Sequence, residues 1–215
     1  MWGAITGLVA EAALIRSTPL EIVVGGGTPD GAARAAQLLL NRGAKVLISF
    51  GLAGGLNPTY PSGTLLIPRA ILVGSTLYHC DPDLCRALGG STGDLLLGHD
   101  AIASTSAEKS HLFKTTGAAA LDLESGAVAA LAHAHGAKFA ALRAIADPAW
   151  RTLPSLALDA LDDQGKIKLR SILRELMRHP KTLPGLLQLG VDANRARHTL
   201  RAAIIQCRWE NASFA

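Results

Sequence analysis

Residues 121–149 read LDLESGAVAALAHAHGAKFAALRAIADPA, and their pattern predicts a helix followed by a buried strand. The small residues of Leu123–His135 favour the helix, and the apolar run Lys138–Ala146 favours the strand. Arg143 lies in the middle of this strand, and Asp147 follows its end. A charged group in the protein interior costs several kcal/mol unless it is paired or used. We therefore expect Arg143 and Asp147 to be paired with neighbours or to take part in chemistry.

The rest of the chain alternates strand and helix patterns in the same way. A helix is predicted over Asp30–Leu40, and further strands over Gly3–Val9, Leu20–Val24, Lys45–Phe50, Thr64–Val73 and Asp94–Leu97. This alternation predicts an α/β fold with a mostly parallel sheet. After Pro154 the pattern changes to amphipathic helices broken by Pro180 and Pro184.

Composition and charge narrow the function classes. The 215 residues are 49% apolar, 18% charged and only 4% aromatic, which favours one compact domain and argues against a stacking platform for nucleic acid. Cys80, Cys85 and Cys207 match no zinc module. No leader pattern and no uncharged apolar run of about 18 residues is visible, so we expect a cytoplasmic protein with reduced thiols.

The positive charge is concentrated near the C-terminus. Residues 164–208 contain ten Lys/Arg and two acids, although the whole chain carries only +4. Apolar residues alternate with basic ones there: Leu169, Ile172, Leu173 and Leu176 with Lys166, Lys168, Arg170 and Arg174. This pattern predicts either peripheral contact with an anionic membrane or an ordinary helix with a solvated basic face.

Three predicted strands are followed by residues suited to a ligand. Gly25–Gly27, Gly51–Gly55 and Asp147 each come just after a strand, and ligands of parallel α/β sheets bind at the carboxyl ends of strands. Gly25, Gly26 and Gly27 could receive an anion on free backbone N–H groups or form only a tight turn. Glu11 and Glu124 add two acids, and no histidine or cysteine spacing predicts a metal site.

Three segments then resemble the purine nucleoside phosphorylase / methylthioadenosine (adenosylhomocysteine) nucleosidase superfamily: ITGLVAEAALIR (5–16), SFGLAGGLNPTYPSGTLLIP (49–68) and the stretch quoted first. The tail beyond Pro148 resembles the hopanoid-biosynthesis-associated phosphorylases, or adenosylhopane nucleosidases. The resemblance implies a three-layer α/β/α phosphorylase-like fold with a mixed, mostly parallel sheet. Residues 1–215 would form a single domain, with an active-site core over 1–150 and a helical extension over 151–215.

The resemblance also implies roles for the charged residues. Asp147 matches the acid that protonates purine N7, and Arg143 matches an arginine on the water or anion side of the site. Glu124 matches the residue that binds the ribose hydroxyls, and Glu11 matches the base that activates water. Further substrate contacts would come from Leu123, Ala53, Gly54 and Ile102. The resemblance implies no cofactor, with inorganic phosphate as a co-substrate only in the phosphorolytic alternative, and it suggests a homodimer.

This sequence departs from the family pattern at four positions. Ala146 replaces a serine before the acid, and Leu123 replaces a methionine. Leu52 replaces a Ser or Thr that helps to hold phosphate, which favours water as the nucleophile. Ile102 stands near the place where the family stacks an aromatic ring on adenine.

The sequence therefore predicts an enzyme that releases adenine from a 5′-substituted nucleoside by hydrolysis or phosphorolysis, with adenosylhopane as the expected substrate. A methylthioadenosine/adenosylhomocysteine nucleosidase and a general purine nucleoside phosphorylase are the alternatives. A non-catalytic nucleoside- or lipid-binding module is the alternative of another class. We expect no nucleic-acid partner.

Overall fold

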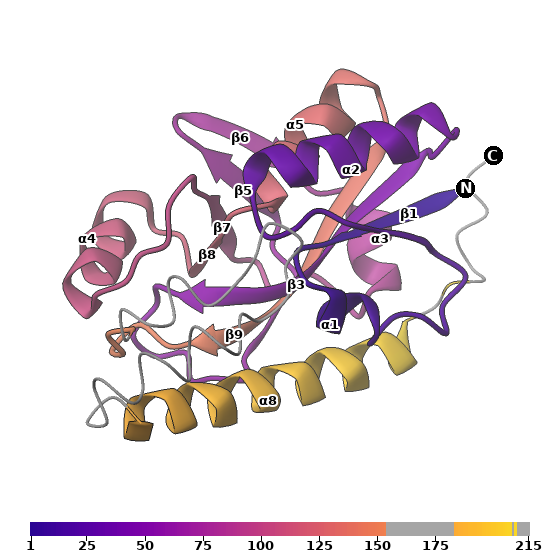
Figure 1. The fold of residues 1–215 in the computed structure, drawn as a ribbon. Coiled ribbons are helices and arrows are strands. Elements are labelled where there is room, and N and C mark those ends of the chain that lie inside the picture. The colour runs from indigo at the N-terminus through magenta and orange to yellow at the C-terminus, as the bar shows by residue number, and fades with distance from the viewer. Residues whose placement is uncertain (154–182, 208, 210–215) are drawn as a thin grey trace.

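The computed structural model describes residues 1–153, 183–207 and 209 (Figure 1). The predicted basic membrane-facing helix at 166–176 lies outside the described residues, as does Pro180. Among the described residues, no helix has both the length and the hydropathy that a bilayer crossing requires. Cys80, Cys85 and Cys207 are free thiols, as expected.

The centre of the fold is a mixed sheet in which two long buried strands lie side by side. β1 (Trp2–Thr6) pairs in parallel with β2 (Glu21–Val24) and with β3 (Val46–Gly55). β3 pairs in parallel with β9 (Lys138–Asp147) along its length. β9 is buried from its second residue to its last, as the apolar run predicted for a strand covered on both faces.

The remaining strands extend the sheet beyond the end of β3. β8 (Ala120–Asp122) pairs antiparallel with the last residues of β3 and in parallel with β7 (Leu95–Gly98). β5 (Ala70–Val73) follows β7 in parallel, and β6 (Thr76–His79) pairs antiparallel at the edge. β4 (Leu65–Leu66) pairs antiparallel with β9. Most pairings are parallel, which confirms the predicted α/β class.

Helices cover both faces of the sheet and give the three layers (Figure 1). α2 (Pro29–Asn41) and α5 (Ser125–Ala134) pack against one another, and α8 (Leu183–Gln206) runs along β9 on the opposite side. Three shorter helices complete the described chain: α1 (Val9–Ala12), α3 (Pro82–Ala87) and α4 (Ser106–Thr116).

Polar contacts fix α8 to the loop before β4. The Ser62 hydroxyl donates to Asp192 Oδ1 at 2.8 Å, and the Thr199 hydroxyl donates to the Gly63 carbonyl at 2.9 Å. Gly63 has a φ of +88°, and a Cβ atom there would come within 2.8 Å of the Arg195 side chain. The helix can therefore approach this loop closely only because a glycine stands at the contact.

Several predicted boundaries were wrong for identifiable reasons. The strand predicted over Gly3–Val9 ends at Thr6, because α1 follows. Gly51–Gly55 belong to β3 itself and do not form a loop after it. The strand predicted over Thr64–Val73 is two strands, β4 and β5, with Pro68 between them; proline lacks the N–H that a continuous ladder needs. Pro184 lies in the first turn of α8, where proline is tolerated, and the residues that precede this helix lie outside the described part of the chain.

Candidate active site

A cavity of about 270 Å³ opens where β1, β3 and β9 end. Four acids line it: Glu11, Asp122, Glu124 and Asp147. The other lining residues are apolar or glycine, and no lysine or arginine is among the described ones. The cavity is therefore an apolar pocket with acidic groups at a few positions, the composition typical of small-molecule sites.

Most of the residues singled out from the sequence meet at this cavity. Its lining includes Glu11, Gly27, Ala53, Gly54, Ile102, Leu123, Glu124 and Asp147. Leu52, the departure from the phosphate-binding pattern, also lines it. Arg143, Gly25 and Gly26 are not among the lining residues, so their predicted contacts with a ligand need another interpretation.

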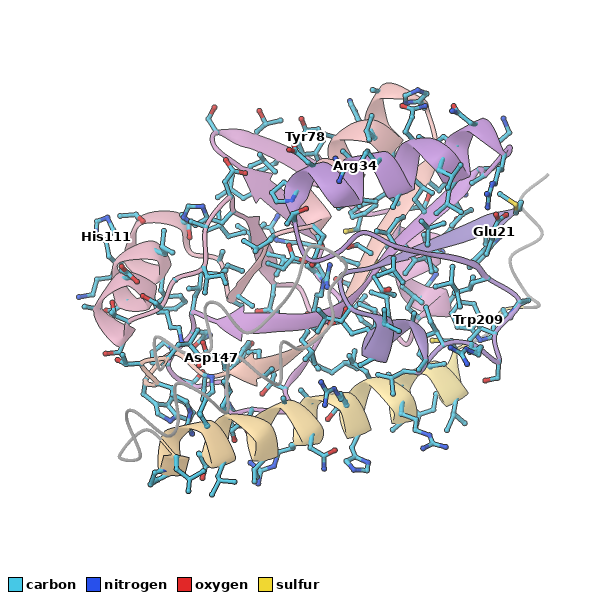
Figure 2. The ribbon with its side chains drawn as sticks, in the orientation of Figure 1. Glu21, Arg34, Tyr78, His111, Asp147 and Trp209 are labelled. Carbon is cyan, nitrogen blue, oxygen red and sulfur yellow. The ribbon has the colours of Figure 1, made fainter. Side chains whose placement is uncertain are left out.

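Asp147 is the last residue of β9, and Pro148 follows it. Figure 2 shows Asp147 where β9 ends, between α4 and α8. Burial raises the pKa of the Asp147 carboxyl, although Lys109 and Arg151 oppose the rise. The Oδ1 atom is buried and has no hydrogen-bond partner among the described residues. A carboxyl group with a raised pKa and an unengaged oxygen is suited to donate a proton.

Lys109, which the sequence analysis missed, is paired with Asp147. It lies on α4, has no exposed surface and places Nζ 2.5 Å from Asp147 Oδ2. The sequence around it, SAEKSHLF, shows no clear apolar face, so nothing marked this lysine as buried. Only the proximity of α4 to the end of β9 in the folded chain makes the pair visible.

Glu11 is held at the cavity by two backbone N–H groups. It lies on α1 directly after β1, where Leu8 N donates to its Oε2 at 2.9 Å and Leu52 N donates to its Oε1 at 2.8 Å. Burial raises the pKa of the Glu11 carboxyl, and Arg143 and these backbone hydrogen bonds oppose the rise. A carboxylate with a raised pKa is a stronger base than a solvated one, which suits it to accept a proton from water.

Arg143 lies beneath the cavity and connects the acids. Its Nη2 atom is 2.6 Å from Asp122 Oδ2, 3.1 Å from Glu124 Oε2 and 2.6 Å from the Ser49 hydroxyl. Burial alone would lower the pKa of the guanidinium, but the carboxylates of Asp122, Glu124 and Glu11 raise it. The Arg143 side chain is fully buried and paired with acids, which favours a positioning role over the predicted role of holding water or an anion.

Glu124 is the residue before the first turn of α5, and its side chain makes no capping hydrogen bond. Burial raises the pKa of its carboxyl to about 8; Arg143 opposes the rise, and Asp122 and Glu11 add to it. The carboxyl lies against Gly7, where a Cβ atom would come within 2.2 Å of Glu124 Oε1. Any side chain at position 7 would displace this acid.

The raised pKa of Glu124 predicts how the free energy of unfolding depends on pH. Glu124 binds its proton more tightly in the folded state than at its usual pKa of 4.5, so its contribution to stability is complete below that value and is lost as pH rises through about 8. We expect the free energy of unfolding to fall between pH 5 and pH 8, and to fall less in Glu124→Gln. Urea titrations of both proteins at the two pH values would measure this. Equal changes in the two proteins would contradict the assignment.

The glycine turn after β2 packs against a helix at its first position. Gly25 touches α2, since a Cβ atom there would meet the Ala32 backbone at 3.0 Å. Only Gly27 lines the cavity. Close packing explains Gly25, and the φ of +81° at Gly26 fits a tight turn. Anion binding by the three glycines stays a prediction.

A metal site is absent from the described part of the chain. No group of three or more His, Cys, Asp or Glu residues there could hold an ion. His133 packs edge-on against Tyr78, with ring centroids 5.9 Å apart, and His135 contacts the Leu131 carbonyl. The cavity therefore offers acid–base groups: one acid at Asp147, and two further carboxyl groups at Glu11 and Glu124. This arrangement can protonate a leaving group and deprotonate an incoming nucleophile.

Comparisons with known proteins give one family match and several solved structures with a similar fold. The family model described as the phosphorylase superfamily matches residues 6–177. S-adenosylhomocysteine nucleosidase from Streptococcus pyogenes, solved with 5-methylthiotubericidin, has a similar structure with a TM-score of 0.65 and 14% identity, covering 95% of each chain. The 5′-methylthioadenosine/S-adenosylhomocysteine nucleosidase from Neisseria meningitidis, solved with methylthio-immucillin-A, is also similar. Its TM-score is 0.65 at 17% identity, and the match covers 95% of this chain and 98% of that one.

A third solved structure has a different activity in its name. Futalosine hydrolase of Helicobacter pylori strain 26695 gives a TM-score of 0.63 at 16% identity, covering 81% of this chain and 97% of that chain. No curated protein sequence matches the chain. At these identities the structural likenesses establish a common fold and nothing more.

Proposed function

The chain belongs to the phosphorylase superfamily, and on that basis we propose that it cleaves the N-glycosidic bond of a 5′-substituted adenine nucleoside. One observation carries the proposal: Asp147, Glu11 and Glu124 line one cavity, and burial raises the pKa of all three carboxyl groups. An acid for the leaving base and a base for the nucleophile are what the reaction needs.

In the proposed bond cleavage, each proton that moves has a donor and an acceptor at the site. The C1′–N9 bond breaks with its electron pair going to the purine, and the Asp147 carboxyl gives its proton to N7, so that adenine leaves neutral. Glu124 binds the ribose hydroxyls and supports the positive charge that develops on the sugar. Water forms the new bond to C1′, and its proton goes to Glu11. Exchange with solvent then restores both carboxyl groups.

Water rather than phosphate is the proposed nucleophile. The polar side chains that line the cavity are acids, and among the described lining residues none is a cation that would attract phosphate. Arg143 lies beneath the acids and is occupied by them. The described lining residues therefore offer an anion no positive charge, whereas Glu11 offers water a base. Leu52 at the cavity also favours this assignment.

The finer proposal concerns the 5′ substituent. Beyond the acids, the cavity presents bulky apolar side chains: Leu8, Leu52, Ile102, Leu121, Leu123, Leu153 and Leu189. These side chains can pack against an apolar group but cannot bind a polar one. Together with the resemblance of the tail to adenosylhopane nucleosidases, they support adenosylhopane as the substrate, in hopanoid lipid biosynthesis. A cavity of about 270 Å³ holds a nucleoside, so the lipid part would extend through the mouth.

The first experiment incubates the purified protein with adenosine, methylthioadenosine, adenosylhomocysteine and adenosylhopane, each with and without phosphate, and measures adenine and the sugar product. Release of adenine from adenosylhopane without phosphate is the expected result. Preference for methylthioadenosine or adenosylhomocysteine would establish a nucleosidase and reject the lipid substrate. Release that requires phosphate would make the enzyme a phosphorylase. Absence of release from all four substrates would favour the binding module.

A lipid-linked substrate further predicts where the enzyme works. We expect a cytoplasmic homodimer that meets its substrate at the inner membrane through its basic C-terminal region. Flotation with anionic liposomes would test the contact, and binding that persists on neutral lipid would contradict an electrostatic one. Light scattering would give the oligomeric state.

Leu189 should determine how strongly the enzyme prefers a substrate with an apolar 5′ group. It lies on α8 and lines the cavity, so Leu189→Glu would place a charge where an apolar substituent packs. Loss of one such leucine contact is worth about 1.5–3 kcal/mol, so we expect kcat/KM for the apolar substrate to fall about 10- to 100-fold, and that for adenosine to fall less.

The matched control is Leu187→Glu, two residues away on the same helix. Leu187 is 63% exposed and does not line the cavity, so this variant should keep the activity on both substrates. If Leu189→Glu lowered the two activities equally, the leucine would not contribute to specificity for the 5′ group.

A further inference from the structure

Helix α4 has only one buried residue, and that residue is a lysine. The Lys109 ammonium donates to Asp147 Oδ2 at 2.5 Å, to the Arg151 carbonyl at 2.8 Å and to the Pro148 carbonyl at 3.3 Å. An ammonium has three donors, so all of them are used at the end of β9. Burying such a group costs several kcal/mol unless it is fully bonded, so the position calls for an explanation beyond packing.

The two oxygens of Asp147 are treated differently by this arrangement. Oδ2 is held by Lys109, whereas Oδ1 is buried without a hydrogen-bond partner among the described residues. Ala146 stands before the acid and supplies no hydroxyl to orient it. The lysine is therefore the side chain that fixes the rotation of the carboxyl group, and it leaves Oδ1 for a ligand.

Resting on the function proposed above, we propose that Lys109 is the positioning residue for the acid: it holds Oδ2 so that Oδ1 carries the proton given to the purine. When that proton moves from Oδ1 to N7, Asp147 becomes a carboxylate beside the ammonium, which stabilises the new charge. Lys109 keeps its own protons throughout the step. It thus acts on the transition state through Asp147 without touching the substrate.

The other charged groups around the pair are largely balanced. Arg151 and Asp192 both face Asp147, and they pair with one another, Nη2 to Oδ2 at 2.7 Å. Glu108 is next to Lys109, but its carboxylate is engaged by the Thr105 and Ser104 N–H groups at the start of α4. Lys109 is therefore the cation that controls the proton on Asp147. Burial lowers the pKa of the Lys109 ammonium, and Asp147 opposes this change.

Lys109→Met tests the proposal, since methionine fills similar space without charge. We expect maximal adenine release to fall 10-fold or more, and the alkaline limb of the pH profile to move up by about one to three pH units, because a nearby cation lowers a carboxyl pKa by that amount. Lys109→Arg keeps the cation and should keep the limb near its original pH. Lys114→Met, at an exposed position of the same helix, should match the original protein.

If Lys109 only anchored α4, Lys109→Met would lower the stability and the rate but would not move the alkaline limb of the pH profile. That outcome would overturn the proposal. A second measurement does not depend on activity: ¹³C NMR titration of the Asp147 carboxyl, assigned by its loss in Asp147→Asn. An upward move of its titration in Lys109→Met supports the coupling, and an unchanged titration rejects it. If the original protein released no adenine, the proposed function would fail while this titration still decided the role of Lys109.

Discussion

Asp147→Asn should reduce adenine release by about 10²- to 10⁴-fold, the contribution typical of general acid catalysis. Asparagine keeps the shape of the side chain, and its oxygen can still accept a hydrogen bond from Lys109, so we expect the fold to persist. It has no carboxyl proton for N7, so adenine would have to leave as an anion. Steady-state kinetics on the preferred nucleoside would measure the loss, and calorimetry with adenine would show that binding persists.

A substrate whose leaving group needs no proton supplies the internal control for Asp147→Asn. A 4-nitrophenyl riboside needs no protonation to depart, so any cleavage of it by the original protein should survive in Asp147→Asn. Asp100→Asn, at an exposed position, should leave both activities unchanged. A variant that lost both reactions equally would show that Asp147 supports the structure of the site rather than protonating the base.

Arg143→Met should destabilise the protein by about 3–5 kcal/mol, since removing one partner of a buried ionic cluster leaves its charges uncompensated. Asp122, Glu124 and Glu11 would then share a buried site without their cation. Domains of this kind have about 5–15 kcal/mol in total, so the loss takes a large part of the stability. Urea-induced unfolding followed by circular dichroism would measure it.

The charge explanation has its own test in a double replacement. Adding Glu124→Gln to Arg143→Met removes one of the unpaired carboxyl groups, so part of the lost stability should return. Arg34→Met, at an exposed position of α2, should change the free energy of unfolding by less than about 0.5 kcal/mol. A loss below 1 kcal/mol in Arg143→Met would mean that the buried acids do not depend on this arginine.

The resemblance of the sequence to the superfamily was sufficient to predict that Glu11, Glu124 and Asp147 lie at one site. β1 and β9 both run parallel to β3, so the residues at their carboxyl ends, Glu11 after β1 and Asp147 at the end of β9, are brought to one edge of the sheet. Glu124 comes after β8, which is antiparallel to β3, so its place in the cavity depended on the resemblance. The strand that contains Arg143 was predictable from its apolar run. An arginine can be buried in this strand because acids surround its guanidinium group and pair with it.

Other parts of the site depend on contacts that no local pattern encodes. Lys109 reaches Asp147 across 38 residues of sequence, and the lysine stands in a helix without a clear apolar face. Leu189 joins the cavity only because α8 packs along β9. Gly51 was expected in a loop, yet it continues β3, where a Cβ atom would meet Arg143 Nη1 at 2.5 Å. Each case requires the tertiary arrangement before the residue can be interpreted.

The attachment of α8 has a consequence for how this enzyme could diversify. The helix is held through Ser62, Gly63, Asp192 and Thr199, whereas the Asp147 carboxyl is held by Lys109. Leu189 makes none of these attachment contacts, so replacing it should leave the hydrogen bond between Lys109 and Asp147 in place. A combinatorial library at Leu153 and Leu189 should yield descendants with altered substrate ranges while their shared acid–base apparatus is inherited intact.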